Sequence, residues 1–218
     1  MGLTISYTLS ARRKPPEAML LQFAERTAEF ARKIGCDRVF GPHPGGPGHW
    51  KMWKLPDGST TGEQLSALDG WSVSVLPGEG CENADFGLCR YPGVKGWKLT
   101  SYCKTQYAAR YGIEHFLACH RRVISLLDLW RDFGVKLDVC DEGEYWQTRS
   151  LDHLRQRVGI YDRLVAAVAG AMKDSTEEGT PLEAEIFNDA RFERLEAEGR
   201  EEFAAQLDQM RRHLSLLR

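Results

Sequence analysis

The sequence predicts an α+β fold in which one antiparallel sheet is covered by two helices on a single face. Three observations support this prediction. Short segments alternate large apolar with small or polar residues, two segments have amphipathic helical periodicity, and the two kinds of segment follow each other in a definite order. Alternation with a period of two gives each strand one wet face, which is typical of a sheet covered on one side only.

Four segments carry the strand alternation, and in each the apolar residues share one parity. The segments are residues 3–10, 71–75, 97–104 and 135–140. In the first of them the apolar positions are Leu3, Ile5, Tyr7 and Leu9, and Thr or Ser fills the positions between. We therefore expect four strands whose exposed faces form one polar surface.

Two segments between these strands have the spacing of amphipathic helices. The first begins at Pro15 and Pro16, where a missing N–H costs least, and ends at Gly35. The second runs from about Ile113 to Phe133 and is followed by a glycine. The resulting order of strand, helix, strand, strand, helix, strand resembles the ferredoxin-like βαββαβ sandwich. This likeness is one of element order alone and implies no function.

Two insertions interrupt the predicted sandwich of residues 1–149. Residues 36–70 contain a Gly/Pro-rich loop at 41–49, which we expect to lack regular structure. The segment that follows the loop ends at a Pro-Asp-Gly-Ser turn, so a hairpin arm is expected there. Alternatively, residues 36–40 are the second strand. The second insertion, residues 78–96, is expected to be a Gly-rich loop.

Residues 150–218 are expected to form a C-terminal helical extension. A helix is predicted from about Leu151 to Met172, and a later segment places apolar residues at alternating four- and three-residue steps. These residues are Phe203, Leu207, Met210, Leu214 and Leu217. A seam of this length is too short for a stable free coiled coil, so it is expected to dock on the sheet or on a second subunit.

Composition limits the function classes. The chain has 218 residues, 42% of them hydrophobic and 28% charged, and its net charge is −2, so no basic excess favours nucleic acid. Neither a signal-peptide pattern nor an apolar run of membrane-spanning length is present, so a cytoplasmic protein without membrane contact is expected. The six cysteines are then expected to be reduced thiols.

Cysteine and histidine spacing does not predict a metal site. His115 and Cys119 lie four residues apart on a predicted helix, but two ligands do not close a zinc site. In the predicted sandwich Cys103 lies at one end of the sheet and the loop with Cys81 lies at the other. No metal or cofactor is therefore expected, and His120, in the apolar helix face, is expected to be a hydrogen-bonded core residue.

One polar constellation follows two strand ends that the predicted topology brings together beside the start of the first strand. Its members are Lys104, Gln106, Tyr107, Asp138, Asp141, Glu142, Glu144 and Trp146. They could form a pocket for a small polar ligand, with carboxylates as a base or as cation ligands and Trp146 as a wall. The favoured alternative is a solvated loop with ordinary ion pairs, in which Trp146 anchors the following helix.

The Gly/Pro-rich loop supplies a second candidate site through its histidines, His43 and His49. Histidines beside a flexible segment can bind a metal or act as acid and base. Loops also carry histidines that have no such role, which is the favoured interpretation here.

No catalytic motif is present, so the leading hypothesis is a binding or interaction protein without catalysis. We expect it to associate with itself, as a homodimer, or with another protein through its C-terminal helices. The alternative is a small enzyme that uses the polar constellation at the two strand ends.

Overall fold

The computed structural model describes residues 3–176 and 184–216, which form two compact units. The first unit spans residues 3–151 and contains all the strands. The second unit begins at residue 152 and is helical. The chain is therefore an α+β protein, as the sequence predicts.

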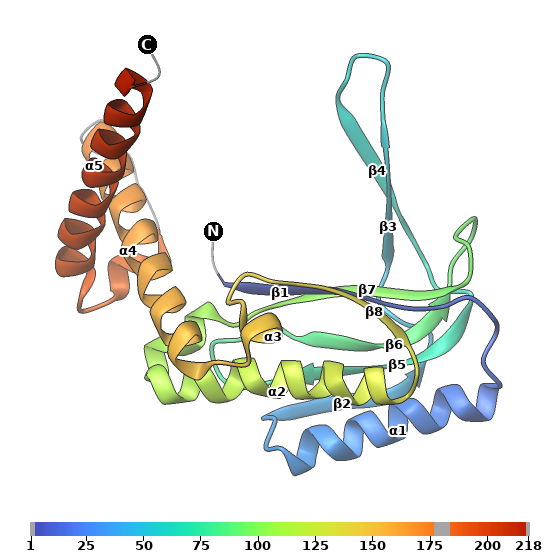
Figure 1. The fold of residues 1–218 in the computed structure, drawn as a ribbon. Coiled ribbons are helices and arrows are strands. Elements are labelled where there is room, and N and C mark those ends of the chain that lie inside the picture. Colours follow the sequence, from blue (N-terminus) through green and yellow to red (C-terminus); the bar gives the residue numbers. More distant parts are fainter. Residues whose placement is uncertain (1–2, 177–183, 217–218) are drawn as a thin grey trace. The chain divides into compact units, whose positions relative to one another are not determined.

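The first unit is built on a six-stranded antiparallel sheet with the order β2-β5-β6-β7-β1-β8 (Figure 1). The strands are β1 (Thr4–Ala11), β2 (Arg38–Pro44), β5 (Asp69–Leu76), β6 (Ala84–Arg90), β7 (Trp97–Lys104) and β8 (Lys136–Asp141). On β1, Thr4 lies opposite Lys104 of β7, and Ile5 lies opposite Asp141 of β8. The ends of β7 and β8 therefore meet at the start of β1.

Two helices, α1 (Glu17–Lys33) and α2 (Ile113–Asp132), cover the same face of this sheet (Figure 1). The Phe23 ring of α1 stacks on Phe133 and meets Trp130 edge-on, which joins the two helices. Gly35 and Gly134 follow the helices with φ of +81° and +78°. The left-handed region is most accessible to glycine, so the predicted helix ends are confirmed.

The core lies between the sheet and these helices. Its completely buried strand residues alternate with polar ones, because successive side chains of a strand point to opposite faces. They include Ile5, Leu9, Val73, Val75, Phe86 and Leu99. The opposite face is open, and it exposes Ser6, Thr100, Tyr102, Asp138 and Cys140. The predicted polar face of the sheet is thus present.

The ferredoxin-like arrangement is not confirmed, because the sheet has six strands and a different order. The predicted second and third strands, β5 and β7, are not neighbours, since β6 lies between them. The expectation of a loop over residues 78–96 was wrong for this strand. The high glycine content of residues 78–96 hides the alternation of buried Ala84, Phe86 and Leu88 with Asp85.

The first insertion also contains more regular structure than expected. Residues 41–44 belong to β2, which pairs with β5 and is irregular between Phe40 and His43. The predicted hairpin arm is present as β3 (His49–Lys54) and β4 (Thr60–Leu65), a separate two-stranded sheet (Figure 1). The side chains of Trp50, Met52 and Trp53 on this arm are exposed.

The second unit contains two long helices, α4 (Leu151–Ser175) and α5 (Phe192–Leu216), with the short η2 (Glu185–Asn188) before α5 (Figure 1). Its core contains Ala166, Ala169, Phe192 and Leu195. Ion pairs join Arg163 to Glu202 at 2.8 Å and Arg200 to Asp174 at 2.6 Å. Within the predicted seam, Phe203 and Leu207 are exposed. Leu217 and the side chains of Met210 and Leu214 lie outside the described residues.

The cysteines are arranged differently from the prediction. With β6 in the sheet, the loop that precedes it lies at the same end as Cys103, and the Cys103 sulfur is 3.1 Å from the carbonyl oxygen of Glu82. Cys81 therefore lies near Cys103 and not at the opposite end of the sheet. The missed strand accounts for this error, because it returns the chain along the length of the sheet.

Candidate functional site

A cleft of about 480 Å³ opens between the open face of the sheet and the base of the arm. We name it the arm-base cleft. It is lined by Pro47, Gly48, His49, Trp50, Gln64, Glu82, Asn83, Asp85, Thr100, Ser101 and Tyr102. These residues come from four parts of the chain that only the folded sheet unit brings together. A concave site of this size can hold a small molecule or a peptide side chain.

Two carboxylates line the cleft, and both are positioned by β6. Asp85 follows the buried Ala84 and precedes the buried Phe86, so alternation places it on the open face. Its backbone N–H donates to the Ser101 hydroxyl at 3.2 Å, and its carbonyl oxygen accepts from the Tyr7 hydroxyl at 2.9 Å. These bonds fix the backbone at Asp85 while its carboxylate remains half-exposed.

The second carboxylate belongs to Glu82, which is exposed in the loop before β6. One of its oxygens accepts a hydrogen bond from the backbone N–H of Lys104 at 3.3 Å. Within the part of the chain that the structure describes, neither Glu82 nor Asp85 forms an ion pair. The lining itself contains no lysine or arginine, so its charge is negative.

Two aromatic rings stand beside these carboxylates. Tyr102 of β7 and Trp50 of β3 are each 60% exposed, which is unusual for side chains of this size. The base of the arm is fixed by the Tyr91 hydroxyl, which donates to the carbonyl oxygen of Pro47 at 2.8 Å. The His49 ring packs 5.1 Å from the Tyr91 ring.

His49 lines the cleft as a neutral group. Burial lowers the pKa of its imidazole, and the nearby charge of Lys98 lowers it further. His43, the other loop candidate, lies on β2, where its Nε2 is 3.2 Å from the hydroxyl oxygen of Ser72. The structure therefore places one of the two predicted histidines, His49, in the cleft.

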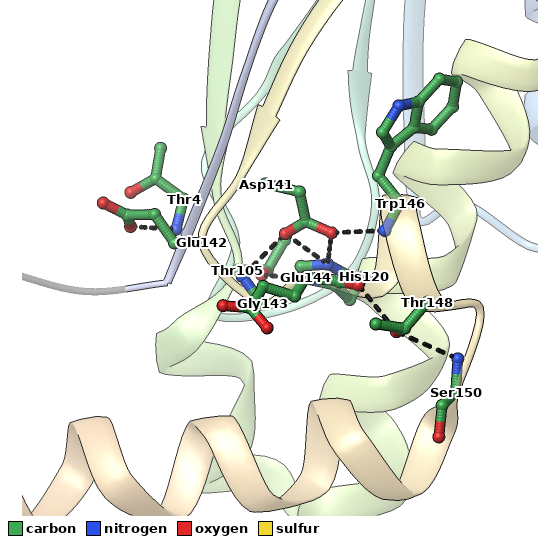
Figure 2. A network of polar contacts seen from close by, with 10 residues as sticks. All are labelled: Thr4, Thr105, His120, Asp141, Glu142, Gly143, Glu144, Trp146, Thr148 and Ser150. Carbon is green, nitrogen blue, oxygen red and sulfur yellow. Dashed lines mark hydrogen bonds and ion pairs between the residues drawn. The ribbon is translucent and has the colours of Figure 1, made fainter.

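The constellation predicted at the two strand ends contains a buried network that Figure 2 shows around Asp141. The Asp141 carboxylate accepts from the backbone N–H groups of Gly143 and Trp146, both at 2.8 Å, and pairs with His120 at 3.1 Å. Burial opposes ionisation, but the bonds from His120, Trp146 and Gly143 outweigh it and lower the Asp141 pKa. All of these partners of the Asp141 carboxylate are groups of the protein that hold the sheet unit together. The expected hydrogen-bonded core position of His120 is confirmed.

Other members of the constellation hold the start of β1. The Gln106 amide oxygen accepts from the backbone N–H of Leu3 at 3.1 Å, and Gln106 is buried. Glu142 accepts from the backbone N–H of Thr4 at 2.8 Å (Figure 2). These two contacts join β1 to the segments that follow β7 and β8.

The remaining members make contacts of different kinds. Lys104 lies over the Tyr107 ring at 5.6 Å, and Asp138 is exposed on the open face of β8. Glu144 adopts φ of +57° at the start of the short helix α3 (Tyr145–Thr148). The Trp146 ring of that helix contacts the guanidinium groups of Arg131 and Arg149. The structure thus brings the two strand ends together, and none of these eight residues lines the arm-base cleft.

Sequence reasoning missed the two carboxylates of the arm-base cleft. A signal for Asp85 was present, because it alternates with apolar residues in the overlooked strand β6. No local signal connects it with Trp50, which lies far away in sequence and reaches the cleft only through the arm.

Among residues 3–176 and 184–216, no three His, Cys, Asp or Glu side chains are arranged to hold a metal ion. In the same residues, no helix has both the length and the apolar character needed to cross a membrane. In comparisons with known proteins, no protein-family model, no curated protein and no solved structure matches this chain.

Proposed function

We propose that this chain is a binding protein whose arm-base cleft holds a cationic group, an ammonium or a guanidinium. The observation that carries this proposal is the pair of carboxylates, Glu82 and Asp85, beside two exposed rings in a lining without lysine or arginine. Lys98 lies near His49 but does not line the cleft. A desolvated cation gains from both parts of this site, since carboxylates pair with it and aromatic faces attract it.

The two aromatic rings make their own contribution to the binding of a cation. An exposed Trp or Tyr face contributes about 0.5–1 kcal/mol to the binding of a cation, and the contribution grows with desolvation. Trp50 lies on the arm and Tyr102 on the sheet, so a ligand between them would contact both parts of the unit. We therefore expect Trp50 fluorescence to change when the cleft is filled.

The experiment is a fluorescence and calorimetric titration of the full chain with two cationic probes. Spermidine represents a free polyamine, and an arginine-containing hexapeptide represents a protein segment. We expect saturable binding of one probe, and the better one identifies the source of the cation. Glu82→Gln combined with Asp85→Asn should weaken binding about tenfold, which corresponds to the loss of about 1.4 kcal/mol.

Glu79→Gln is the matched control, because Glu79 is exposed in the same loop but does not line the cleft. It should bind the probe as the unaltered chain does. Tyr102→Ala should weaken binding about threefold. If neither probe binds, or if the double variant and the Glu79 variant bind equally well, the proposal is wrong.

A second observation favours self-association through the helical unit. Four apolar side chains of α4 recur at every fourth residue and are each at least 36% exposed. They are Ile160, Leu164, Val168 and Met172. Phe203 and Leu207 of α5 are exposed as well. Rows at four-residue spacing form the ridges by which helices pack, so a second copy of this helix pair is the proposed partner.

Light scattering on the full chain tests this association. We expect the mass of a dimer, and we expect Leu164→Lys combined with Val168→Lys to give a monomer. Lys173→Glu, an exposed change on the same helix, should leave the dimer intact. A monomeric unaltered chain at high micromolar concentration would contradict the proposal.

The enzyme alternative at the two strand ends stays a prediction that these contacts do not support. Asp141 and Gln106 are buried, and bonds within the protein occupy Asp141, Gln106 and Glu142.

A further inference from the structure

The loop between β5 and β6 packs closely over Cys119 of α2. The Arg122 guanidinium donates to the carbonyl oxygen of Pro77 at 2.7 Å, and His115 Nε2 lies 3.0 Å from the carbonyl oxygen of Glu79. Gly78 lies so close to the Cys119 sulfur that a Cβ at this position would collide with it. The loop therefore encloses one sulfur among the side chains of α2.

The surroundings of the Cys119 sulfur favour its anionic form. His115 Nε2 is 3.5 Å from the sulfur, and Arg122 Nη1 donates to it at 3.9 Å. Cys81 lies in the covering loop, and the interaction of its thiol with this sulfur lowers the Cys119 pKa. A permanent cation, Arg122, therefore donates to a sulfur that has no contact with solvent, and the His115 ring lies beside the same sulfur.

These contacts shift the pKa values of the two cysteines in opposite directions. The bond from Cys81, together with the charges of His115 and Arg122, lowers the pKa of Cys119 in spite of its burial. The same bond, together with burial, raises the pKa of Cys81. A nucleophilic thiolate beside a protonated second cysteine is the arrangement of a redox-sensing pair.

We propose that Cys119 and Cys81 form an oxidation-sensitive pair that hydrogen peroxide converts to a disulfide. In the first step the Cys119 thiolate attacks one peroxide oxygen. An S–O bond forms, the O–O bond breaks, and the leaving hydroxide takes up a proton from the buffer acid and becomes water. Cys119 is oxidised to a sulfenic acid, and the peroxide is reduced to water.

In the second step the Cys81 sulfur attacks the Cys119 sulfur. The S–S bond forms as the S–O bond breaks, and the leaving hydroxide takes the Cys81 proton and departs as water. Because Cys119 is completely buried, only a small oxidant that enters when the loop opens can reach it. Hydrogen peroxide is small enough for this path, whereas a disulfide reagent is larger.

The neighbouring cysteines do not fit this role. Burial raises the Cys36 pKa to about 11, and burial also raises the pKa of Cys103 well above its ordinary value. The Cys103 thiol donates to the carbonyl oxygen of Glu82. Both therefore stay protonated and unreactive at neutral pH.

The test is treatment of the full reduced chain with equimolar hydrogen peroxide, followed by intact-mass measurement and peptide mapping. We expect the loss of two hydrogens and one cross-linked peptide pair that joins Cys81 to Cys119. The exposed Cys140 is the internal control, because accessibility alone would make it react first. We expect Cys119 to react before Cys140, because Arg122 and His115 beside its sulfur stabilise the thiolate.

Three variants sharpen the test. Cys81→Ser should leave a sulfenic acid on Cys119 that dimedone traps, and Cys119→Ser should abolish the cross-link. Cys89→Ser, a buried cysteine outside this cluster, should leave the cross-link unchanged. If a variant does not fold, mapping of the unaltered chain still decides the matter. Oxidation of Cys140 ahead of Cys119, or a disulfide between other cysteines, would overturn the proposal.

Discussion

His120 Nε2 lies 3.1 Å from one oxygen of the Asp141 carboxylate and 3.2 Å from the other, and neither side chain is exposed. The other ring nitrogen, Nδ1, is 2.9 Å from the hydroxyl oxygen of Thr105, which is buried as well. This chain of contacts connects the end of β7 with the middle of α2 and the end of β8. A buried polar network of this kind rigidifies the fold when all its members are satisfied.

Asp141→Asn is expected to lower the free energy of unfolding by about 3 kcal/mol, because removing one partner leaves the other buried and unpaired. The amide would also place a donor near backbone N–H groups that now donate to the carboxylate. Urea unfolding at pH 7, followed by tryptophan fluorescence, measures the change. Asp138→Asn is the matched control, since Asp138 lies on the same strand but is exposed. It should change stability by less than about 0.5 kcal/mol.

The Asp141 contribution is expected to depend on pH in one direction. Its pKa is lowered from the ordinary value of 3.8, so the folded state favours the ionised form. The stabilisation is therefore complete above pH 3.8 and is lost as the pH falls through the lower pKa of the folded state. The stability difference between the unaltered chain and Asp141→Asn should shrink as the pH falls below 3.8. A difference that widens in acid would contradict this.

Two glycines of the helical unit are expected to respond oppositely to alanine. Gly199 packs against the Arg163 carbonyl oxygen, so a Cβ there forces α5 away from α4 and should cost about 1–3 kcal/mol. A Cβ on Gly159 would meet only Arg163 Nη1 at 3.4 Å, so Gly159→Ala should stabilise α4 by about 0.5–1 kcal/mol. Hydrogen exchange of the α5 amides measures both effects. Equal protection in the two variants would show that close packing at Gly199 is unimportant.

Arg149 offers a test of backbone strain, since it ends α3 with φ of +54°. Its guanidinium donates to both carboxylate oxygens of Asp128, at 2.7 and 2.9 Å, and lies over the Trp146 ring. Arg149→Ala and Arg149→Gly both remove these contacts, but only glycine relieves the left-handed backbone. The glycine variant should therefore be about 1 kcal/mol more stable than the alanine variant in thermal unfolding.

Much of the sheet unit could be predicted, because its strongest patterns are local. The alternation over 3–10 and 97–104 gave two neighbouring strands, and glycines at helix ends gave correct helix limits. Strand β6, which the sequence analysis overlooked, has a weaker alternation because Gly87 at its centre has no side chain. Missing that strand also displaced Cys81 from its true neighbours.

The candidate cleft could not be predicted for a different reason. Its carboxylates depend on the overlooked strand, and Trp50 reaches it through an arm whose own pairing is independent of the main sheet. The polar constellation at the strand ends was grouped correctly by topology, because both strand ends flank β1. Topology does not determine which polar groups turn inward, and there the backbone N–H groups of residues 143 and 146 bind Asp141.

The two strands of the arm pair only with each other. Their first pair, His49 with Leu65, holds the two ends of the arm segment together at its base. Nearly all of its side chains beyond this pair are exposed, so they contribute little to the core that holds the sheet. Lengthening, shortening or exchanging the tip is therefore compatible with an unchanged scaffold. The arm is the part of this molecule where evolution, or an engineer, can change the sequence at the lowest risk to folding.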